Sequence, residues 1–280
     1  MRASIAQISH IATLPEVTLR VIKLVEDPDS TAQDLNNVIS NDPALGARIL
    51  KVVNSSFYGL PGQIGSINRA IVLLGLNAVK NVAIAASLAK LFRGGQICPS
   101  FDAHALWTHS IAVASATQML SARIGLGLPD EAFLAGLIHD LGIMVEMQAH
   151  RTKLIEAVER LESEPELAFR QVEQEVFGAD HEQFGAGLCR AWKFPLSFAN
   201  VTGYHHRPLE VAADQRTLAS LVHIADVLAA RGDIGYRRTV ETNEINPQLL
   251  EELKLTQPTI DSISEELPET AEKTSDMLML

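Results

Sequence analysis

Apolar residues recur at helical spacing along almost the whole chain, and this pattern restricts the possible folds more than any other feature. Near the N-terminus, for example, one face of a helix would carry Leu14, Val17, Val21, Leu24 and Val25. No segment shows the alternation of apolar and polar residues that marks a half-buried strand. The sequence therefore predicts an all-α fold with little β structure.

Helix start and stop signals divide this pattern into short helices. Thr31 and Asp34 form a capping-box pattern, and Asp42 followed by Pro43 opens a further helix. Gly75 separates two more helices. The helices predicted after residue 60 span residues 67–74, 77–92, 104–124, 130–140, 151–163, 166–176, 181–192, 196–205 and 215–230.

A chain of 280 residues, of which 47% are hydrophobic, can bury one large core or two smaller ones. The clearest internal boundary is the stretch from Arg93 to Ser100, which contains glycine and proline. We therefore expect an N-terminal helical bundle subdomain at 1–95, packed on a second helical subdomain at 96–255. The acidic tail at 256–280 has the composition of a flexible segment. Its apolar residues are nevertheless expected to dock on the rest of the chain, namely Leu267, Met277, Leu278, Met279 and Leu280.

The charge balance argues against a nucleic-acid or membrane-surface protein. The chain carries 34 acidic and 23 basic residues, which gives a formal net charge of −11. One helix-turn-helix-like stretch at residues 66–84 offers Asn68, Arg69 and Lys80 to a groove. Its strongly apolar face favours two packed core helices instead, so nucleic acid is not an expected partner.

Cysteine usage and the apolar stretches bear on cellular location. Cys98 and Cys189 lie far apart and outside any CxxC pattern, so they predict neither a disulfide framework nor a cysteine zinc site. The N-terminal residues lack the continuous apolar core of a secretory signal. The longest apolar stretches are too short or too interrupted to span a bilayer. These features predict a cytoplasmic protein without a membrane partner.

The residues that carry chemistry centre on His139 and Asp140, which are adjacent at the end of a strongly apolar segment. Polar side chains delivered by such a segment need partners in the core. The full candidate set contains five imidazoles and two carboxylates: His109, His139, Asp140, His181, His205, His206 and Asp226.

Imidazoles and carboxylates together suit divalent Fe, Mn, Zn or Ni, and one carboxylate can bridge two ions. The set could therefore hold one or two ions, or form a hydrogen-bonded polar network without metal. A metal-bound water can attack a phosphoester, and Asp140 is the candidate catalytic residue in that case. His223 lies one helical turn before Asp226 and could reach the same cavity. The histidines outside the set are interpreted as structural or exposed: His10, His104, His150 and His223.

The order His, His-Asp, His, His-His, Asp resembles the metal-ligand series of the HD superfamily, and in particular its HD-GYP branch. The long run from LPEV to GLNAVKNV, followed by ALWTHS, AFLAGLIHDLG and the DH, GAGL, W and FP series, resembles the HDOD family. The resemblance covers about residues 8–230 and rests on several long motifs in the family's order. It implies a helical bundle packed on an HD-like helical subdomain, and a signalling or regulatory role in a bacterium.

Three positions depart from the pattern of an active HD-GYP enzyme. Ile143 stands where those enzymes have a lysine, and Ala105 stands where some members have a metal-binding glutamate. The Gly-Tyr-Pro loop is missing after His206. These departures remove groups that handle substrate and leave the ligand series, so hydrolysis of a cyclic guanine dinucleotide is not expected.

We therefore favour a signalling module that is non-catalytic or weakly catalytic and acts on a protein partner; homo-oligomer formation is left open. The alternative is a metal-dependent phosphohydrolase acting on a nucleotide or phosphoester. Its core ligands would be His109, His139, Asp140 and Asp226. It needs a cation in place of the missing lysine, and the candidates are Lys80, Arg190 and Lys193.

Overall fold

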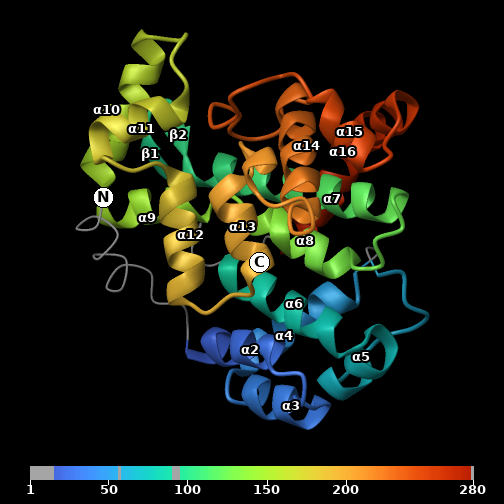
Figure 1. Cartoon of the computed structure of the whole chain (residues 1–280). Helices are drawn as coiled ribbons and strands as arrows, with labels where there is room; N and C mark the ends of the chain where they lie inside the picture. Colours follow the sequence, from blue (N-terminus) through green and yellow to red (C-terminus); the bar gives the residue numbers. More distant parts are fainter. Residues whose placement is uncertain (1–15, 56–57, 90–94, 279–280) are drawn as a thin grey trace.

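The computed structural model describes residues 16–55, 58–89 and 95–278 (Figure 1). Helices form nearly all the regular structure in these residues, beside one two-stranded sheet. The predicted all-α fold is therefore confirmed. Several predicted features lie outside the described residues: His10, Leu14, the helix end at 90–92, the boundary residues Arg93 and Gly94, and Met279 and Leu280.

The N-terminal subdomain is a bundle of short amphipathic helices. Its helices are α2 (Glu16–Glu26), α3 (Ala32–Ser40), α4 (Pro43–Val53), α5 (Ile67–Leu74) and α6 (Leu76–Leu88). Thr31 and Asp34 form the predicted capping box of α3, and Asp42 accepts a hydrogen bond from the Leu45 amide at the start of α4. α6 is buried almost all round and packs against α2, α4 and α5, so it is the central helix of the bundle.

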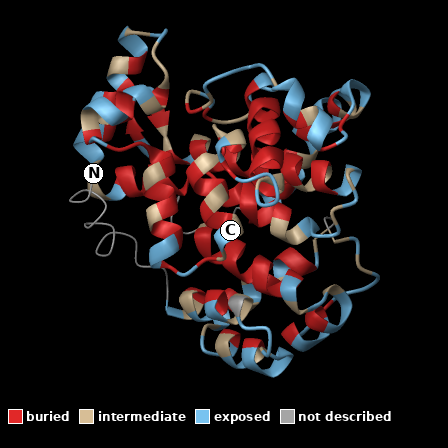
Figure 2. Cartoon of the chain, viewed as in Figure 1, coloured by how far each residue is buried: buried red, intermediate tan, exposed pale blue. Residues whose placement is uncertain are grey.

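The second, C-terminal subdomain begins with a small hairpin and is built around one long helix. β1 (Gln96–Cys98) pairs antiparallel with β2 (Phe101–Asp102), and α7 (Ala103–Arg123) follows directly. Asp102 starts α7 by accepting a hydrogen bond from the amide of His104. Three helices pack on α7, namely α8 (Pro129–Ile138), α14 (Thr217–Arg231) and α16 (Gln257–Leu278). Figure 2 shows that buried residues concentrate in these helices.

α8 is followed at once by α9 (Leu141–Ala149), so the single helix predicted at 130–140 is part of a pair. Both helices are buried on all sides, and a helix without a polar face gives no periodic signal for where it ends. Together they form one stretch, Pro129–Ala149, that is long and apolar enough to cross a membrane. Because 89% of its most apolar window is buried inside the molecule, we interpret it as core.

The remaining helices surround α9 and α14 (Figure 1). They are α10 (Arg151–Ser163), α11 (Phe169–Phe177), α12 (His181–Ala191), α13 (Leu196–Tyr204), a 3-10 turn at Pro208–Glu210, and α15 (Pro247–Glu252). α12 packs against both α9 and α13, and α13 packs against α14. The predicted helices between residues 151 and 230 are thus all present, with ends shifted by a few residues.

The acidic tail forms α16, a helix of 22 residues that packs along α7. The Oγ of Ser115 on α7 donates to the Oγ1 of Thr274, and near the end of α16 Met277 contacts Ser55 of the N-terminal subdomain. The flexibility suggested by composition is therefore wrong, and the expected docking is confirmed for Leu267, Met277 and Leu278, whereas Met279 and Leu280 lie outside the described residues. The residues that dock are Ile260, Ile263, Leu267, Ala271, Thr274, Met277 and Leu278.

The two subdomains meet where α6 packs against α8. The hydroxyl of Tyr58 in the N-terminal subdomain donates to the Oδ1 of Asp130 at the start of α8, at 3.1 Å. Buried apolar residues form one continuous cluster through both subdomains. The predicted packing of one helical subdomain on the other is therefore confirmed.

Candidate metal centre

His139 and Asp140 occupy the turn between α8 and α9, where both side chains are buried. The Nδ1 of His139 lies 2.7 Å from the carbonyl oxygen of Gly136, so it donates to that carbonyl. This hydrogen bond points the Nε2 of His139 toward Asp140, whose Oδ2 is 3.3 Å away. The turn therefore presents an imidazole nitrogen and a carboxylate side by side in the core.

α7 supplies His109 from its buried face. Its Nε2 lies 2.8 Å from the Oδ1 of Asp226 on α14, and its Nδ1 lies 3.3 Å from the carbonyl oxygen of Ile234. Gly235, with a φ of +74°, lets the chain after α14 approach α7 closely. A Cβ atom there would lie 2.4 Å from the backbone nitrogen of His109. The absence of a side chain at Gly235 therefore permits the position of His109 beside Asp226.

His181 is the first residue of α12, whose N-terminus is fixed by the Asp180–Gln183 capping box. The Glu173 carboxylate accepts from both the Nδ1 and the backbone amide of His181, at 2.8 and 3.1 Å. Gly142 on α9 lies against this residue, and a Cβ there would be 1.8 Å from the His181 carbonyl oxygen. The close approach of α9 and α12 leaves the Nε2 of His181 at 3.6 Å from the Oδ1 of Asp140.

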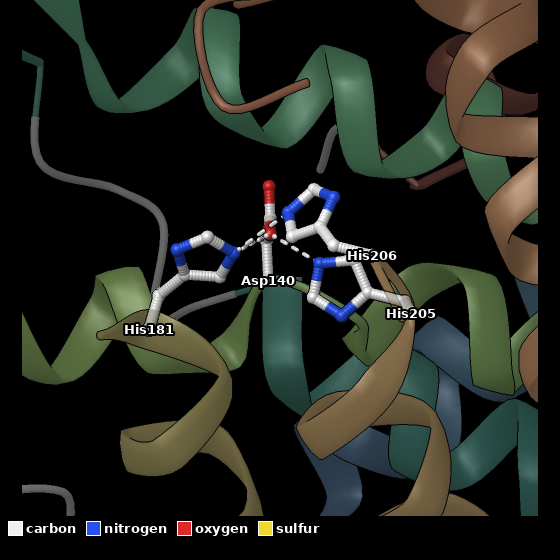
Figure 3. A group of neighbouring side chains, drawn as sticks. All are labelled: Asp140, His181, His205 and His206. Atoms are coloured by element: carbon white, nitrogen blue, oxygen red, sulfur yellow. Dashed lines mark hydrogen bonds and ion pairs between the residues drawn. The ribbon is translucent and has the colours of Figure 1, made fainter. Parts of the chain in front are cut away.

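His205 and His206 follow α13. The Nδ1 of His205 donates to the carbonyl oxygen one helical turn earlier, at 3.2 Å, and its Nε2 lies 3.4 Å from the Oδ1 of Asp140. The Nε2 of His206 lies 3.0 Å from the Nε2 of His181. Figure 3 shows the rings of His181, His205 and His206 gathered around the Asp140 carboxylate.

The structure thus brings all seven sequence-predicted residues together. The residues form three overlapping sets, and within each set the ligand atoms all lie within 4.8 Å of one another. The sets are Asp140, His181, His205 and His206; His109, His139 and Asp140; and His139, His205 and Asp226.

Several nitrogen and oxygen atoms of this cluster lack the hydrogen-bond partners that buried polar atoms normally have. The Nε2 atoms of His139 and His205 and both carboxylate oxygens of Asp140 are buried without a hydrogen-bond partner among the described residues. Because each Nδ1 donates to a carbonyl, each Nε2 carries a lone pair and can only accept. Acceptor atoms facing one another in a buried space need a cation or a proton between them. The donor set therefore fits a divalent metal ion.

The pKa shifts of Asp140 and His206 favour the forms in which these residues bind metals. Burial by itself would raise the pKa of Asp140, but the neighbouring His139, His205 and His181 outweigh it and hold the pKa well below its ordinary value. Burial, together with the adjacent His205 and His181, holds the pKa of His206 well below that of a free imidazole. A carboxylate binds a metal in its ionised form, and an imidazole binds a metal in its neutral form.

Two buried glutamates behind His181 were missed by the sequence analysis. Glu173 on α11 orients His181, and burial raises the pKa of Glu173 and of the neighbouring Glu146 on α9 well above the ordinary value. Glu173 falls on the same helix face as Phe169 and Phe177. A carboxylate on the apolar face of an amphipathic helix was the signal available in the sequence.

A third missed glutamate, Glu182, fixes the segment that carries His206. Its Oε1 accepts from the His206 amide at 3.0 Å, and its Oε2 accepts from the guanidinium groups of Arg170 and Arg207. Arg170 also binds Glu241, and Arg207 also binds Glu210. Both cations close to the cluster are therefore already paired with carboxylates.

The histidines outside the candidate set, and the three candidate cations, are not members of the cluster. His104 is exposed and His150 is partly buried outside the cluster, whereas the Nδ1 of His223 donates to the His205 carbonyl oxygen at 2.8 Å. Lys80 is buried in the N-terminal subdomain, where its Nζ binds the Ser30 hydroxyl at 2.6 Å. The two remaining cation candidates are exposed at the end of α12 and in the following turn: Arg190 and Lys193.

Comparison with solved structures places the fold among known proteins. An HDOD domain protein of unknown function from Geobacter sulfurreducens superposes with a TM-score of 0.82 at 21% identity, covering 100% of this chain and 99% of that one. A protein provisionally named a signal transduction protein, from Marinobacter aquaeolei VT8, gives 0.79 at 23% identity, covering 100% and 65%. One provisionally named a phosphohydrolase, from Shewanella amazonensis SB2B, gives 0.75 at 23% identity, covering 99% and 98%.

Sequence comparison gives the family. An uncharacterised protein of Treponema pallidum (strain Nichols) is 26% identical over 231 residues, which are 81% of this chain and 44% of that protein. The chain therefore spans less than half the length of this curated relative. The family model of the HDOD domain matches residues 11–208, which include every candidate ligand except Asp226. The chain belongs to the HDOD domain family.

Proposed function

We propose that this chain is a regulatory HDOD domain whose buried histidine and aspartate cluster holds metal and has little or no hydrolytic activity. The observation that carries the proposal is the burial of the cluster. The side chains of its members are at most 3% exposed, and they face one another. A phosphoester would have to reach these ligands, which their burial opposes, and would need a free cation, whereas the nearby Arg170 and Arg207 are already paired with Glu182.

The cluster has ligands for two ions that share one carboxylate. The Oδ1 of Asp140 faces His181 and His205, whereas its Oδ2 faces His139. We infer that one ion would be held by Asp140, His181, His205 and His206, and a second by Asp140 with His109, His139 and Asp226. A bound divalent ion supplies Lewis acidity and can make a bound water acidic. The ligand types suit Fe, Mn, Zn or Ni.

The surroundings of the cluster support a regulatory role over catalysis. Ile143, at the position where HD-GYP enzymes have lysine, is an apolar core residue with 0% exposure. The two nearby guanidinium groups, Arg170 and Arg207, are bound to Glu182. Neither is available as a free cation for a substrate phosphate. We infer that the domain acts through its helical surface on a protein partner, and a second copy of the chain is one candidate.

A metal-dependent phosphohydrolase remains the second candidate because one observation favours it. The ligand set is complete, including the pair of Asp226 and His109 at 2.8 Å. The similar structure from Shewanella amazonensis carries the provisional name of a phosphohydrolase. In this version His109, His139, Asp140 and Asp226 form the core of the site, and the substrate is a nucleotide or another phosphoester.

Elemental analysis combined with a hydrolysis assay tests both candidates. We expect purified protein to contain a transition metal, and Asp140→Asn to lose most of it, whereas the exposed Asp214→Asn serves as control and retains it. We expect wild-type protein with added manganese or iron to hydrolyse bis-p-nitrophenyl phosphate no faster than Asp140→Asn. Wild-type turnover abolished in Asp140→Asn would favour the phosphohydrolase. Protein that neither contains nor takes up metal would contradict both versions.

A further inference from the structure

A cavity of about 530 Å³ lies between the two subdomains, and none of the residues that line it belongs to the histidine cluster. Its walls come from the α5–α6 turn and α6 on one side, and from the start of α8 and the turn before α13 on the other. Figure 1 shows α6 below α8 and α13 at this junction. Small-molecule sites in proteins measure about 300–1,000 Å³, so the cavity has the size of a ligand site.

Asn81 is the feature of this cavity that packing does not explain. It is 9% exposed and lines the cavity from α6, and its carboxamide makes no hydrogen bond to the described residues but is open to the cavity. Asn77, one helical turn earlier, lines the cavity as well. A carboxamide that is unpaired and open to a cavity is available to hydrogen-bond a molecule bound there. An amide presents a donor and an acceptor side by side, which suits a ligand edge with the same pair.

Three helices begin at this cavity without a side-chain cap. α6, α8 and α13 start after Gly75, Leu128 and Pro195, and none of these residues makes a capping side-chain hydrogen bond. The first-turn amides of α6 have no partner within their own helix, and the residues that carry them line the cavity. These amides add hydrogen-bond donors to the wall opposite α8.

Carboxylates on the α8 side supply the acceptors. Asp130 and Glu131 line the cavity, Asp130 accepts from Tyr58, and Glu131 accepts from Ser197 at 3.3 Å. Each carboxylate retains further lone pairs. Burial raises the pKa of Asp130, so a ligand that donates to its carboxylate would relieve part of the cost of burying it.

The charge and shape of the cavity define the ligand class. No lysine or arginine occurs among the described residues that line it, so phosphate groups find no cation there. The partial positive charges of the helix N-termini offset part of the negative charge of the two carboxylates. Val25, Leu76 and Phe198 add apolar walls suited to a flat ring.

We propose that this inter-subdomain cavity binds a small, uncharged nitrogen heterocycle that carries N–H donors, of the nucleobase kind. The ring lies between the apolar walls, Asn81 pairs with one edge, and Asp130 and Glu131 accept its N–H groups. The inference is independent of the metal centre. Because residues of both subdomains contact the ligand, its binding stabilises their packed arrangement.

Ligand-observed saturation-transfer NMR and calorimetry on the full chain test the proposal. The probes are guanosine and adenosine, and the matched control is caffeine, which keeps the purine shape but has no N–H group. We expect saturable binding of at least one nucleoside, and binding of caffeine roughly tenfold weaker or less. Guanosine 5′-monophosphate should bind no more tightly than guanosine. No saturable binding of either nucleoside, equal binding of caffeine, or a strong gain from the phosphate would overturn the proposal.

Asn81→Leu separates a ligand-binding role from a structural one. Because Asn81 has no partner to lose, the melting temperature of Asn81→Leu should be unchanged or higher, while nucleoside binding falls roughly tenfold or more. The control is Asn68→Leu, an exposed asparagine of α5 outside the cavity, which should bind as wild type does. If Asn81→Leu binds the nucleoside unchanged, or if it unfolds, the assignment of Asn81 is wrong. Asp130→Asn, which retains an acceptor for Tyr58, then tests the opposite wall by the same binding measurement.

Discussion

Gly142 illustrates how a single residue positions the metal centre. Its Cα lies so close to α12 that any added Cβ would be 1.8 Å from the carbonyl oxygen of His181. The nearest atoms are backbone, so no side-chain rotation can relieve the overlap. The contact between α9 and α12, and with it the distance from His181 to Asp140, therefore depends on a missing side chain.

We expect Gly142→Ala to lower the free energy of unfolding by about 1–3 kcal/mol or more, because α9 and α12 must separate. Metal content should fall as well, since His181 moves with α12. Gly46→Ala is the matched control: it also lies inside a helix, and its Cβ would meet only Ile39 at 3.5 Å. That variant should be neutral or gain about 0.5–1 kcal/mol. Chemical denaturation and elemental analysis of both variants test this, and equal stability of the two would contradict it.

At the residue scale, the members of the histidine and aspartate cluster were predictable and their supporting residues were not. His109, His139, Asp140, His181, His205, His206 and Asp226 were found because their residue types and order match a known metal-ligand series. Glu173 and Glu182 escaped detection because a glutamate in a helix is ordinary in sequence, and only the packing of α11 and α12 reveals that both are fully buried. Arg170 and Arg207 were missed for the same reason, since ion pairs link distant segments.

At the element scale, α16 is an ordered, docked helix although its composition is typical of a flexible tail. It is acidic and contains Pro268, yet its apolar residues return every three or four positions and cover one side of α7. The acidic residues occupy the solvent face, where they resemble a disordered tail in composition. Periodicity was therefore the better guide here, whereas it gave no sign of α9, which is buried on all sides and has no polar face.

Leu267→Ala tests whether α16 is an integral part of the core. Leu267 is 1% exposed, so we expect its truncation to lower the free energy of unfolding by about 2–5 kcal/mol. Glu265→Ala, on the exposed side of the same helix, should change it by less than about 0.5 kcal/mol. The measurement is urea denaturation followed by circular dichroism. A small effect in Leu267→Ala would mean that α16 does not hold its position on α7 in solution.

At the scale of the whole molecule, both subdomains share one continuous apolar core, and the candidate metal ligands come from α7, the α8–α9 turn, α12, the segment after α13, and α14. A ligand cluster assembled from so many segments exists only in the folded chain. Metal binding therefore adds directly to the free energy of folding.

We expect saturating metal to raise the melting temperature of the protein in one cooperative transition. A free metal concentration of one hundred times Kd adds about 2.7 kcal/mol, which corresponds to a rise of roughly 5–10 °C for a chain of this size. Differential scanning calorimetry with and without a chelator measures the shift. Asp140→Asn should show no shift. A shift of equal size in that variant would mean that the metal binds elsewhere.

The docking of α16 also has a consequence for the order in which the chain folds during synthesis. Ser115 and Thr274 are 159 residues apart in sequence, and Ser55 and Met277 are 222 apart. When the ribosome has completed α7, α16 has not yet been synthesised. The apolar face of α7 that α16 later covers is therefore still exposed. Native folding of α7, and of His109 on it, is therefore completed only after translation reaches α16, and until then this apolar surface of the nascent chain is open to non-native contacts.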